Sequence, residues 1–196
     1  MVIDGAWKNK VFRLWKEKKC DLAKEEVFKF RMRYYNKLER IEDKIFLDYR
    51  MAYHEYLDKN IELANVYFES LEHIFKDDYV RESCEYEYYS YIWLYINNNE
   101  ENLTDEYKIK EMIEIYNYYK SNSNDGVAIT ALQNISKLQG NQEKILENLK
   151  SLLDSEKIRE WSLVESILKD CEKISSNLYI KALQIVNEYR ININVV

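Results

Sequence analysis

The side chains best suited to acid–base or metal chemistry are sparse in this sequence. His54 and His73 are the only histidines, and neither has a second histidine or a cysteine three or four residues away to complete a metal site. No cysteine or serine stands at a fixed spacing from a base, and no glycine-rich loop could hold a phosphate group. The sequence therefore predicts no catalytic residue, no metal site and no cofactor.

An enzyme with a helical active site stays open as an alternative. Its residues would be scattered ones such as His54, Glu55 and Tyr88. Paired carboxylates such as Asp77 and Asp78 are common on helix surfaces and carry no such signal. Three glycines leave little material for a strained active-site loop, so we expect a protein that is not an enzyme.

The elements that position these side chains are predicted to be helices throughout. Proline is absent from all 196 residues and glycine occurs three times, whereas an ordinary domain of this length carries about ten prolines and about fourteen glycines. Most sheet architectures need glycine-bearing turns. The sequence therefore predicts an all-α fold.

Apolar spacing and helix start and stop signals divide the chain into about ten helices. We expect them near residues 4–18, 21–38, 41–58, 61–75, 78–97, 104–120, 125–139, 142–153, 156–173 and 177–190. Thr104 is expected to cap the sixth. The clearest breaks are at 97–99 and 121–124. We expect one helical-repeat domain over 1–196, with possible sub-segments 1–97, 104–120 and 125–190.

Antiparallel helix pairs with short turns are typical of tetratricopeptide repeats, and partial copies of that pattern occur. The best copy has Met51 and Ala52 followed by Ala64, Phe68 and Leu71. Small alanines would let the two helices of a repeat approach closely. We expect a tetratricopeptide-like, right-handed superhelical array, with a closed helical bundle as the alternative.

A binding site is expected on the inner face formed by the first helices of successive pairs. Tyrosine and arginine are frequent binding hot spots, and polar side chains on a concave surface can bond to a peptide backbone. The candidate ligand-binding residues are Tyr53, Arg81, Tyr91 and Asn134. The alternative is that they are hydrated or core-lining residues, and the aromatic helix at 86–95 has the same two interpretations.

Charge is unevenly distributed along the chain. Residues 1–40 hold twelve Lys and Arg against six Asp and Glu, a net charge of +6, so the remaining residues carry −12. Such polarity attracts an acidic partner to one end. We expect a docking surface for an acidic protein at Lys8, Lys16, Lys18 and Lys19, with a solvated helix face as the alternative.

Composition also bounds the partners and the location. An overall acidic chain disfavours nucleic acid, and no apolar run approaches the roughly 18 residues that would span a bilayer. The first twenty residues carry charges throughout, so no secretory signal is expected. Three distant cysteines fit reduced thiols better than disulfides. We therefore expect a cytoplasmic location.

Residues 38–57, together with the preceding Trp15 and Ala23 helices, resemble the N-terminal helical region of the Rap family, about a third of the chain. These are tetratricopeptide regulators of Gram-positive bacteria, related to peptide-sensing transcription factors and phage arbitrium receptors. The resemblance implies that front helices bind a regulator or DNA and that repeats bind a short peptide. Phosphatase members have a glutamine where Lys44 follows Glu42 and Asp43, so phosphatase activity is not expected.

The predicted function is thus binding of a protein or a short peptide by a helical-repeat protein in a regulatory role. The chain is about half the usual length of that family and has no helix-turn-helix segment. A small inhibitor from a phage or mobile element is the first alternative, and richness in Asn, Lys, Ile and Tyr suits either origin. The partner and the oligomeric state do not follow from the sequence.

Overall fold

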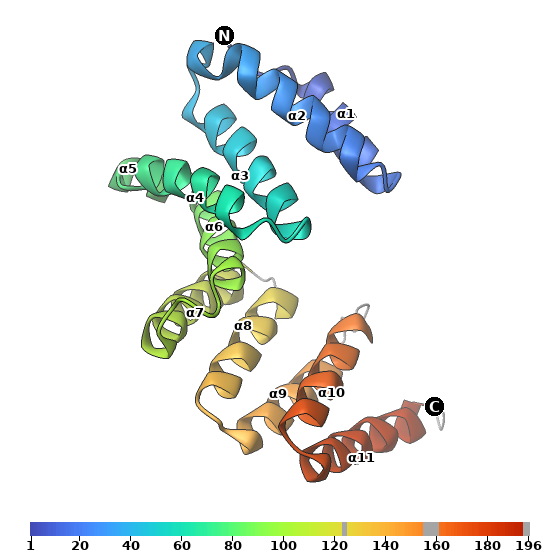
Figure 1. The fold of residues 1–196 in the computed structure, drawn as a ribbon. Helices are drawn as coiled ribbons and strands as arrows, with labels where there is room; N and C mark the ends of the chain where they lie inside the picture. Colours follow the sequence, from blue (N-terminus) through green and yellow to red (C-terminus); the bar gives the residue numbers. More distant parts are fainter. Residues whose placement is uncertain (123–124, 155–160, 194–196) are drawn as a thin grey trace. The chain divides into compact units, whose positions relative to one another are not determined.

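The computed structural model describes residues 1–122, 125–154 and 161–193. In this part of the chain all regular secondary structure is helical (Figure 1), as predicted. The residues divide into two compact units, Met1–Asn102 and Leu103–Val196, called here unit 1 and unit 2. The division falls between the expected sub-segments 1–97 and 104–120. The expected segments 104–120 and 125–190 share unit 2, where their helices pack together.

The helices of unit 1 are α1 (Gly5–Lys16), α2 (Cys20–Tyr34), a 3-10 turn η1 (Tyr35–Lys37), α3 (Ile41–Leu57), α4 (Ile61–Phe75), α5 (Asp78–Ser83) and α6 (Glu85–Asn98). The single helix expected at 78–97 is wrong, because the backbone leaves the helical region at Cys84, with φ −124° and ψ 42°. The helix expected at 21–38 instead ends at Tyr34.

Helix α3 is the central helix of unit 1. It packs against α2, α4 and α6, and α4 in turn contacts α5 and α6. Its Leu47, Met51 and Ala52 are almost fully buried, as is Ala64 on α4. A connection of three residues joins α3 to α4, and α4 packs against α3.

Two buried carboxylates tie α3 to the helices before it. Asp48 is fully buried and accepts hydrogen bonds from Arg31 Nε at 2.7 Å, from Ser70 Oγ at 2.6 Å and from the Tyr35 hydroxyl. Asp43 is equally buried and accepts from the Ile3 backbone N–H at 2.8 Å and from Lys8 Nζ at 2.7 Å. A buried charge must be paired and hydrogen-bonded, so these contacts fix how α1 and α2 lie on α3.

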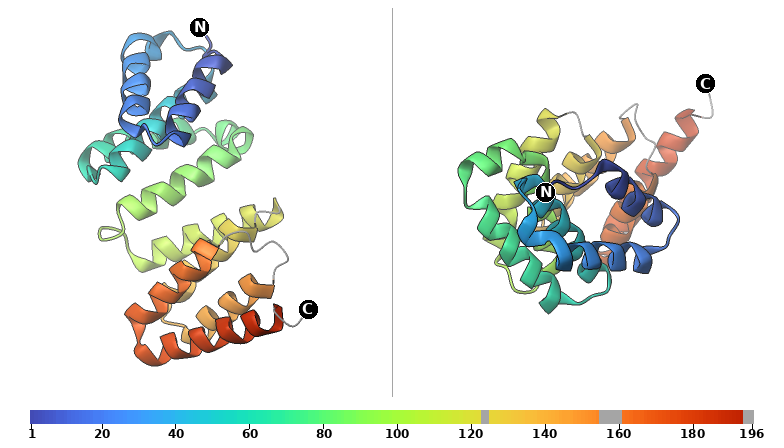
Figure 2. Two further views of the ribbon diagram at one scale, coloured as in Figure 1. Left: turned by 90° about the vertical axis from the view of Figure 1, so that its right-hand side faces the viewer. Right: turned by 90° about the horizontal axis from the view of Figure 1, so that it is seen from above.

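Unit 2 contains α7 (Asp105–Ser121), α8 (Asp125–Leu138), α9 (Gln142–Asp154), α10 (Trp161–Ile174) and α11 (Ser176–Ile193). Each helix of unit 2 packs against the next one along the chain, and α11 also packs against α9. The chain reverses at Ser175 between α10 and α11 (Figure 2). The core of the last three helices is aliphatic, with fully buried Ile145, Leu149 and Ala182.

The helix ends follow from the scarcity of glycine. Gly140 takes the left-handed conformation after α8, with φ 64°. Lys18 and Lys59 take the same conformation after α1 and α3, each with φ 58°, at a steric cost that glycine would not carry. Thr104 caps α7 by accepting from the Tyr107 N–H at 3.3 Å, as predicted.

None of the described helices is long and apolar enough to span a bilayer. The described cysteines are unpaired, with Cys84 and Cys171 buried and Cys20 half-buried. Burial raises the pKa of the Cys171 thiol to about 11, which keeps it protonated and unreactive at neutral pH.

Candidate functional site

Unit 1 has a groove between α1, α3 and α6, called here the α1–α3–α6 groove. Its volume is about 430 Å³, within the range of roughly 300–1,000 Å³ found for small-ligand sites. Its lining residues are Lys8, Phe12, Trp15, Glu42, Ile45, Phe46, Tyr49, Arg50, Tyr53, Tyr86, Glu87 and Ser90.

Helical spacing explains why these residues share one surface. On α1, Phe12 and Trp15 lie three residues apart, one turn after Lys8. On α3, Phe46, Tyr49 and Tyr53 recur at steps of three and four. The opposite face of α3 is occupied by the buried core, so this aromatic stripe faces α1 and the start of α6.

Aromatic contacts make the floor of the groove. The ring centroids of Phe12 and Phe46 lie 5.9 Å apart, and those of Trp15 and Tyr53 lie 5.0 Å apart. Tyr49 and Tyr53 stack with their planes 17° apart. Such pairs contribute about 0.5–1.5 kcal/mol each beyond their buried area, and they give the groove fixed walls.

Arg50 is a cation of this groove that pairs with no acid among the described residues. Its guanidinium lies 4.5 Å from the ring centroid of Phe12 and 5.5 Å from that of Phe46. Nε is buried and has no hydrogen-bond partner, and no carboxylate of the described residues pairs with the side chain. Burial lowers the pKa of Arg50 from its ordinary value, although a guanidinium still stays charged at neutral pH.

The other charges of the groove are distributed around this arginine. Lys8 is bound to the buried Asp43 and lies 5.0 Å from the Phe46 ring centroid. Glu42 lies 3.6 Å from Arg40 Nε. Glu87 is exposed at the start of α6. Arg50 is therefore the cationic group that remains to meet an anion in the groove.

His54 contacts Trp15, one of the residues that line the groove. It is buried, and its Nε2 accepts a hydrogen bond from the Trp15 indole N–H at 3.3 Å. Burial, with smaller contributions from the charges of Lys24 and Arg50, lowers the pKa of His54 to about 4. The imidazole is therefore neutral at pH 7, which is the state that can accept this bond.

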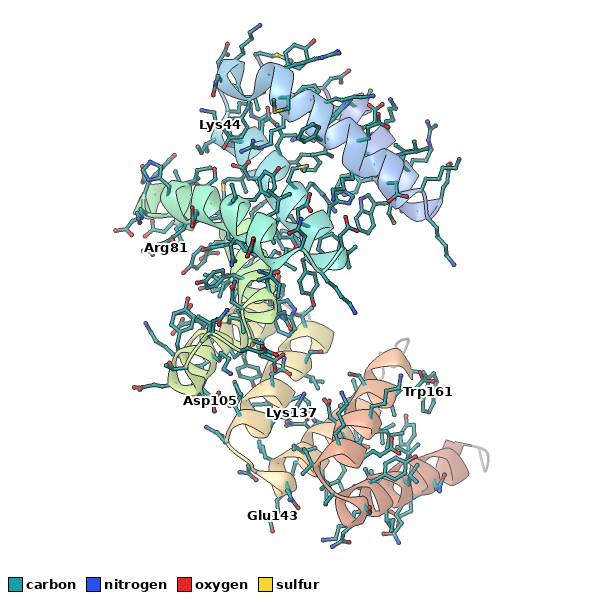
Figure 3. The ribbon with its side chains drawn as sticks, in the orientation of Figure 1. Lys44, Arg81, Asp105, Lys137, Glu143 and Trp161 are labelled. Carbon is teal, nitrogen blue, oxygen red and sulfur yellow. The ribbon has the colours of Figure 1, made fainter. Side chains whose placement is uncertain are left out.

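The four candidate ligand-binding residues lie in four different places. Tyr53 lines the α1–α3–α6 groove. Asn134 lines a separate, small cavity of about 40 Å³ in unit 2, beside Asp170. Asp170 pairs at 3.1 Å with Lys137, which is labelled in Figure 3. Arg81, labelled in Figure 3, pairs with Asp78 on α5 outside the groove. Within unit 1, Tyr53 and Arg81 therefore do not share one surface.

Tyr91 is a core residue. Its exposed fraction is 5%, and its ring lies 6.0 Å from that of Phe68 and 5.7 Å from that of Phe75. The position expected to face a ligand faces α4 instead, because α6 packs there. Tyr88, on the same helix, also packs against Phe75, at 5.3 Å.

The four docking lysines likewise separate. Lys16, Lys18 and Lys19 are exposed at the turn between α1 and α2, where Lys19 pairs with Glu17 at 2.7 Å. Lys8 is half-buried in its ion pair with Asp43. Its ammonium thus neutralises an internal carboxylate, which corrects the expectation that it forms one surface with the other three.

The residues considered for an enzyme make separate structural contacts. Glu55 is buried and pairs with Lys24 at 2.9 Å, His54 accepts from Trp15, and Tyr88 packs on α4. Among the described residues, no three His, Cys, Asp or Glu side chains cluster so as to hold a metal ion.

Sequence reasoning missed most of the groove, including Arg50. A signal existed: Phe46, Tyr49 and Tyr53 form a second stripe on α3, opposite the one that carries Met51 and Ala52. When one apolar stripe of a helix packs against the neighbouring helices, a second stripe on the opposite face is available to line a surface groove. The sequence did not show which stripe that is.

Comparison of the chain with models of protein families, with curated proteins and with solved structures finds no match.

Proposed function

We propose that this chain is a non-enzymatic helical-repeat protein that binds a short peptide, or an extended segment of a partner protein, in the α1–α3–α6 groove, in a regulatory role. The observation that carries the proposal is the combination of an aromatic groove with an unpartnered arginine. Tyr, Trp, Phe and Arg are the residues enriched in protein interfaces and among their hot spots.

The repeat architecture is part of the proposal. Ala52 and Ala64 are fully buried on consecutive, packed helices, which supports a tetratricopeptide-like helix pair, and a right-handed array is the arrangement we propose. The likeness of residues 38–57 to the Rap family supports a regulatory peptide-binding role. Lys44, labelled on α3 in Figure 3, stands 5.9 Å from the Tyr35 ring, and a phosphatase reaction is not part of the proposal.

Selection from a phage library of random hexapeptides on the full chain tests this function. Peptides that emerge should bind with affinities that depend on the groove rim. Phe12 and Tyr86 are 40% and 60% exposed there, so replacing both by alanine removes contact area from the rim, together with the contacts of Phe12 with Phe46 and Arg50. We expect at least a tenfold loss of affinity, the scale of a hot-spot truncation of about 1.4 kcal/mol or more.

A matched control lies outside the groove. Phe28 and Tyr79 are 47% and 78% exposed, and the double variant Phe28→Ala, Tyr79→Ala removes the same two side-chain types. The proposal is supported if this control binds the selected peptides as tightly as the parent protein does and the groove variant binds them more weakly. Equal binding by both variants, or no selected peptide at all, contradicts it.

A further inference from the structure

We infer that the α1–α3–α6 groove selects peptide segments with an acidic side chain, and that Arg50 is the residue that recognises the carboxylate. This inference rests on the proposed function and names the ligand chemistry of the same groove. Its basis is the guanidinium of Arg50, which pairs with no carboxylate among the described residues.

Arg50 lines the groove without an acidic partner among the described residues. Its Nε is buried without a hydrogen-bond partner, and the guanidinium is held by Phe12 and Phe46 at 4.5 and 5.5 Å. A buried polar group without a partner is costly. Aromatic faces offset part of that cost, but they accept no directed hydrogen bond from Nε.

Other arginines of unit 1 show the contrast. Arg31 also stacks on aromatic rings, those of Tyr35 and Tyr67, yet its Nε donates to Asp48 at 2.7 Å. Arg81 lies near the Tyr88 ring and pairs with Asp78. The same aromatic setting thus comes with a carboxylate in these two cases, and Arg50 has the setting without the acid.

The ligand charge that fits is a single carboxylate. Lys8 is already neutralised by Asp43, and Glu42 and Glu87 add negative charge to the lining. A nucleic-acid strand or a phosphate dianion, which favours clustered cations, would meet one arginine and two acids. A planar carboxylate meets the guanidinium fork through paired hydrogen bonds.

The size and lining of the groove favour a peptide segment. About 430 Å³ accommodates one acidic and one large apolar side chain rather than a whole helix. The aromatic walls at Phe12, Trp15 and Tyr53 suit the apolar neighbour. Glu87, exposed at the far rim, favours a basic or neutral residue beyond it.

The test compares selected hexapeptides with isosteres. Each peptide is N-acetylated and C-amidated, so that its only carboxylate is the side chain, and is paired with an Asp→Asn or Glu→Gln copy. We expect the acidic form to bind the full chain at least about tenfold more tightly. In Arg50→Gln that difference should disappear, whereas in Arg81→Gln it should persist.

Stability and NMR readouts separate recognition from folding. Because Arg50 is an unpaired, half-buried charge, Arg50→Gln should leave the Tm unchanged or raise it. In protein labelled with ¹⁵N at arginine Nε, the Arg50 signal should shift on addition of the acidic peptide, and the Arg81 signal should not.

Each outcome decides between the two proposals. If peptides bind in a rim-dependent way but acidic and amide forms bind equally, the acidic preference is wrong and the proposed function stands. If a phosphoserine copy binds more tightly than the carboxylate, the ligand assignment is overturned in favour of phosphopeptides. If no peptide depends on the groove, both proposals fail.

Discussion

The scaffold that presents Arg50 depends on Asp48, two residues before it on α3. This carboxylate is fully buried and accepts hydrogen bonds from α2, η1 and α4 through Arg31, Tyr35 and Ser70. Asp48→Asn keeps the shape of the side chain but removes its negative charge, and it replaces one accepting oxygen by an NH₂ group that donates hydrogen bonds. The two hydroxyls can rotate to accept, whereas the Arg31 guanidinium cannot.

The expected cost of Asp48→Asn is about 2–4 kcal/mol of unfolding free energy. Breaking a fully buried ion pair costs about 3–5 kcal/mol, and a hydrogen bond to a charged group contributes about 1.5–3 kcal/mol. The side chain of Arg31 is 24% exposed and stacks on Tyr35 and Tyr67, so water and the rings recover part of the loss. The cost expected for Asp48→Asn is therefore lower than that of breaking a fully buried ion pair.

Urea denaturation followed by tryptophan fluorescence measures this cost. In a Trp161→Phe background (Trp161 is labelled in Figure 3) the remaining tryptophans, at positions 7, 15 and 93, all belong to unit 1. Glu72→Gln is the control, because Glu72 pairs with Lys76 at 3.8 Å on an exposed face and should cost less than about 1 kcal/mol. If Asp48→Asn is no more destabilising than this control, the network does not hold α2 on α3.

Three further predictions concern packing, protonation and the basic turn. Ala64→Leu should overpack the α3–α4 contact and destabilise unit 1 by about 1–3 kcal/mol, and an unchanged urea midpoint would contradict this. The pKa of His54 is about 4 in the folded protein against an ordinary value of 6.5, so on acidification the unfolded chain takes up the proton before the folded chain does. The unfolding free energy should therefore decrease as the pH falls from 6.5 towards 4. Thermal melts at pH 7 and pH 4.5 should therefore show a smaller acid loss for His54→Gln than for the parent, and equal losses would refute the assignment. Charge reversal at Lys16, Lys18 and Lys19 should slow association with an acidic partner at low salt more than at 1 M salt, where the screening length is about 3 Å; stopped-flow rates equal to the parent's at low salt would mark these residues as a solvated face.

Much of the fold could be predicted because this composition permits few alternatives. Without proline and with few glycines, apolar periodicity alone located the helices, and α4 was predicted with the bounds that it has. The break at Cys84 was missed because neither glycine nor proline marks it. Its helix end is satisfied locally instead, by the Cys84 N–H donating to the Val80 carbonyl at 2.9 Å.

The site was harder to predict because it depends on which helical faces remain unpaired. Tyr53 was identified, but Tyr91 has the same residue type and a buried position. Residue type did not separate the two, since tyrosine suits both a core edge and a binding surface. Lys8 was misjudged and Arg50 was missed for a related reason. Charge alone does not show that Asp43 lies beside Lys8 and that no acid pairs with Arg50.

The most direct test of the central claim is where a selected acidic hexapeptide touches the full chain. p-Benzoylphenylalanine can replace Phe12, at the groove rim, or Phe28, which is similarly exposed on α2, with exposed fractions of 40% and 47%. Photolysis with the bound peptide, followed by mass spectrometry, should give a cross-link from position 12 that an excess of unlabelled peptide abolishes, and none from position 28. Equal cross-linking from both positions, or none from position 12 at saturating peptide, would contradict binding in the α1–α3–α6 groove.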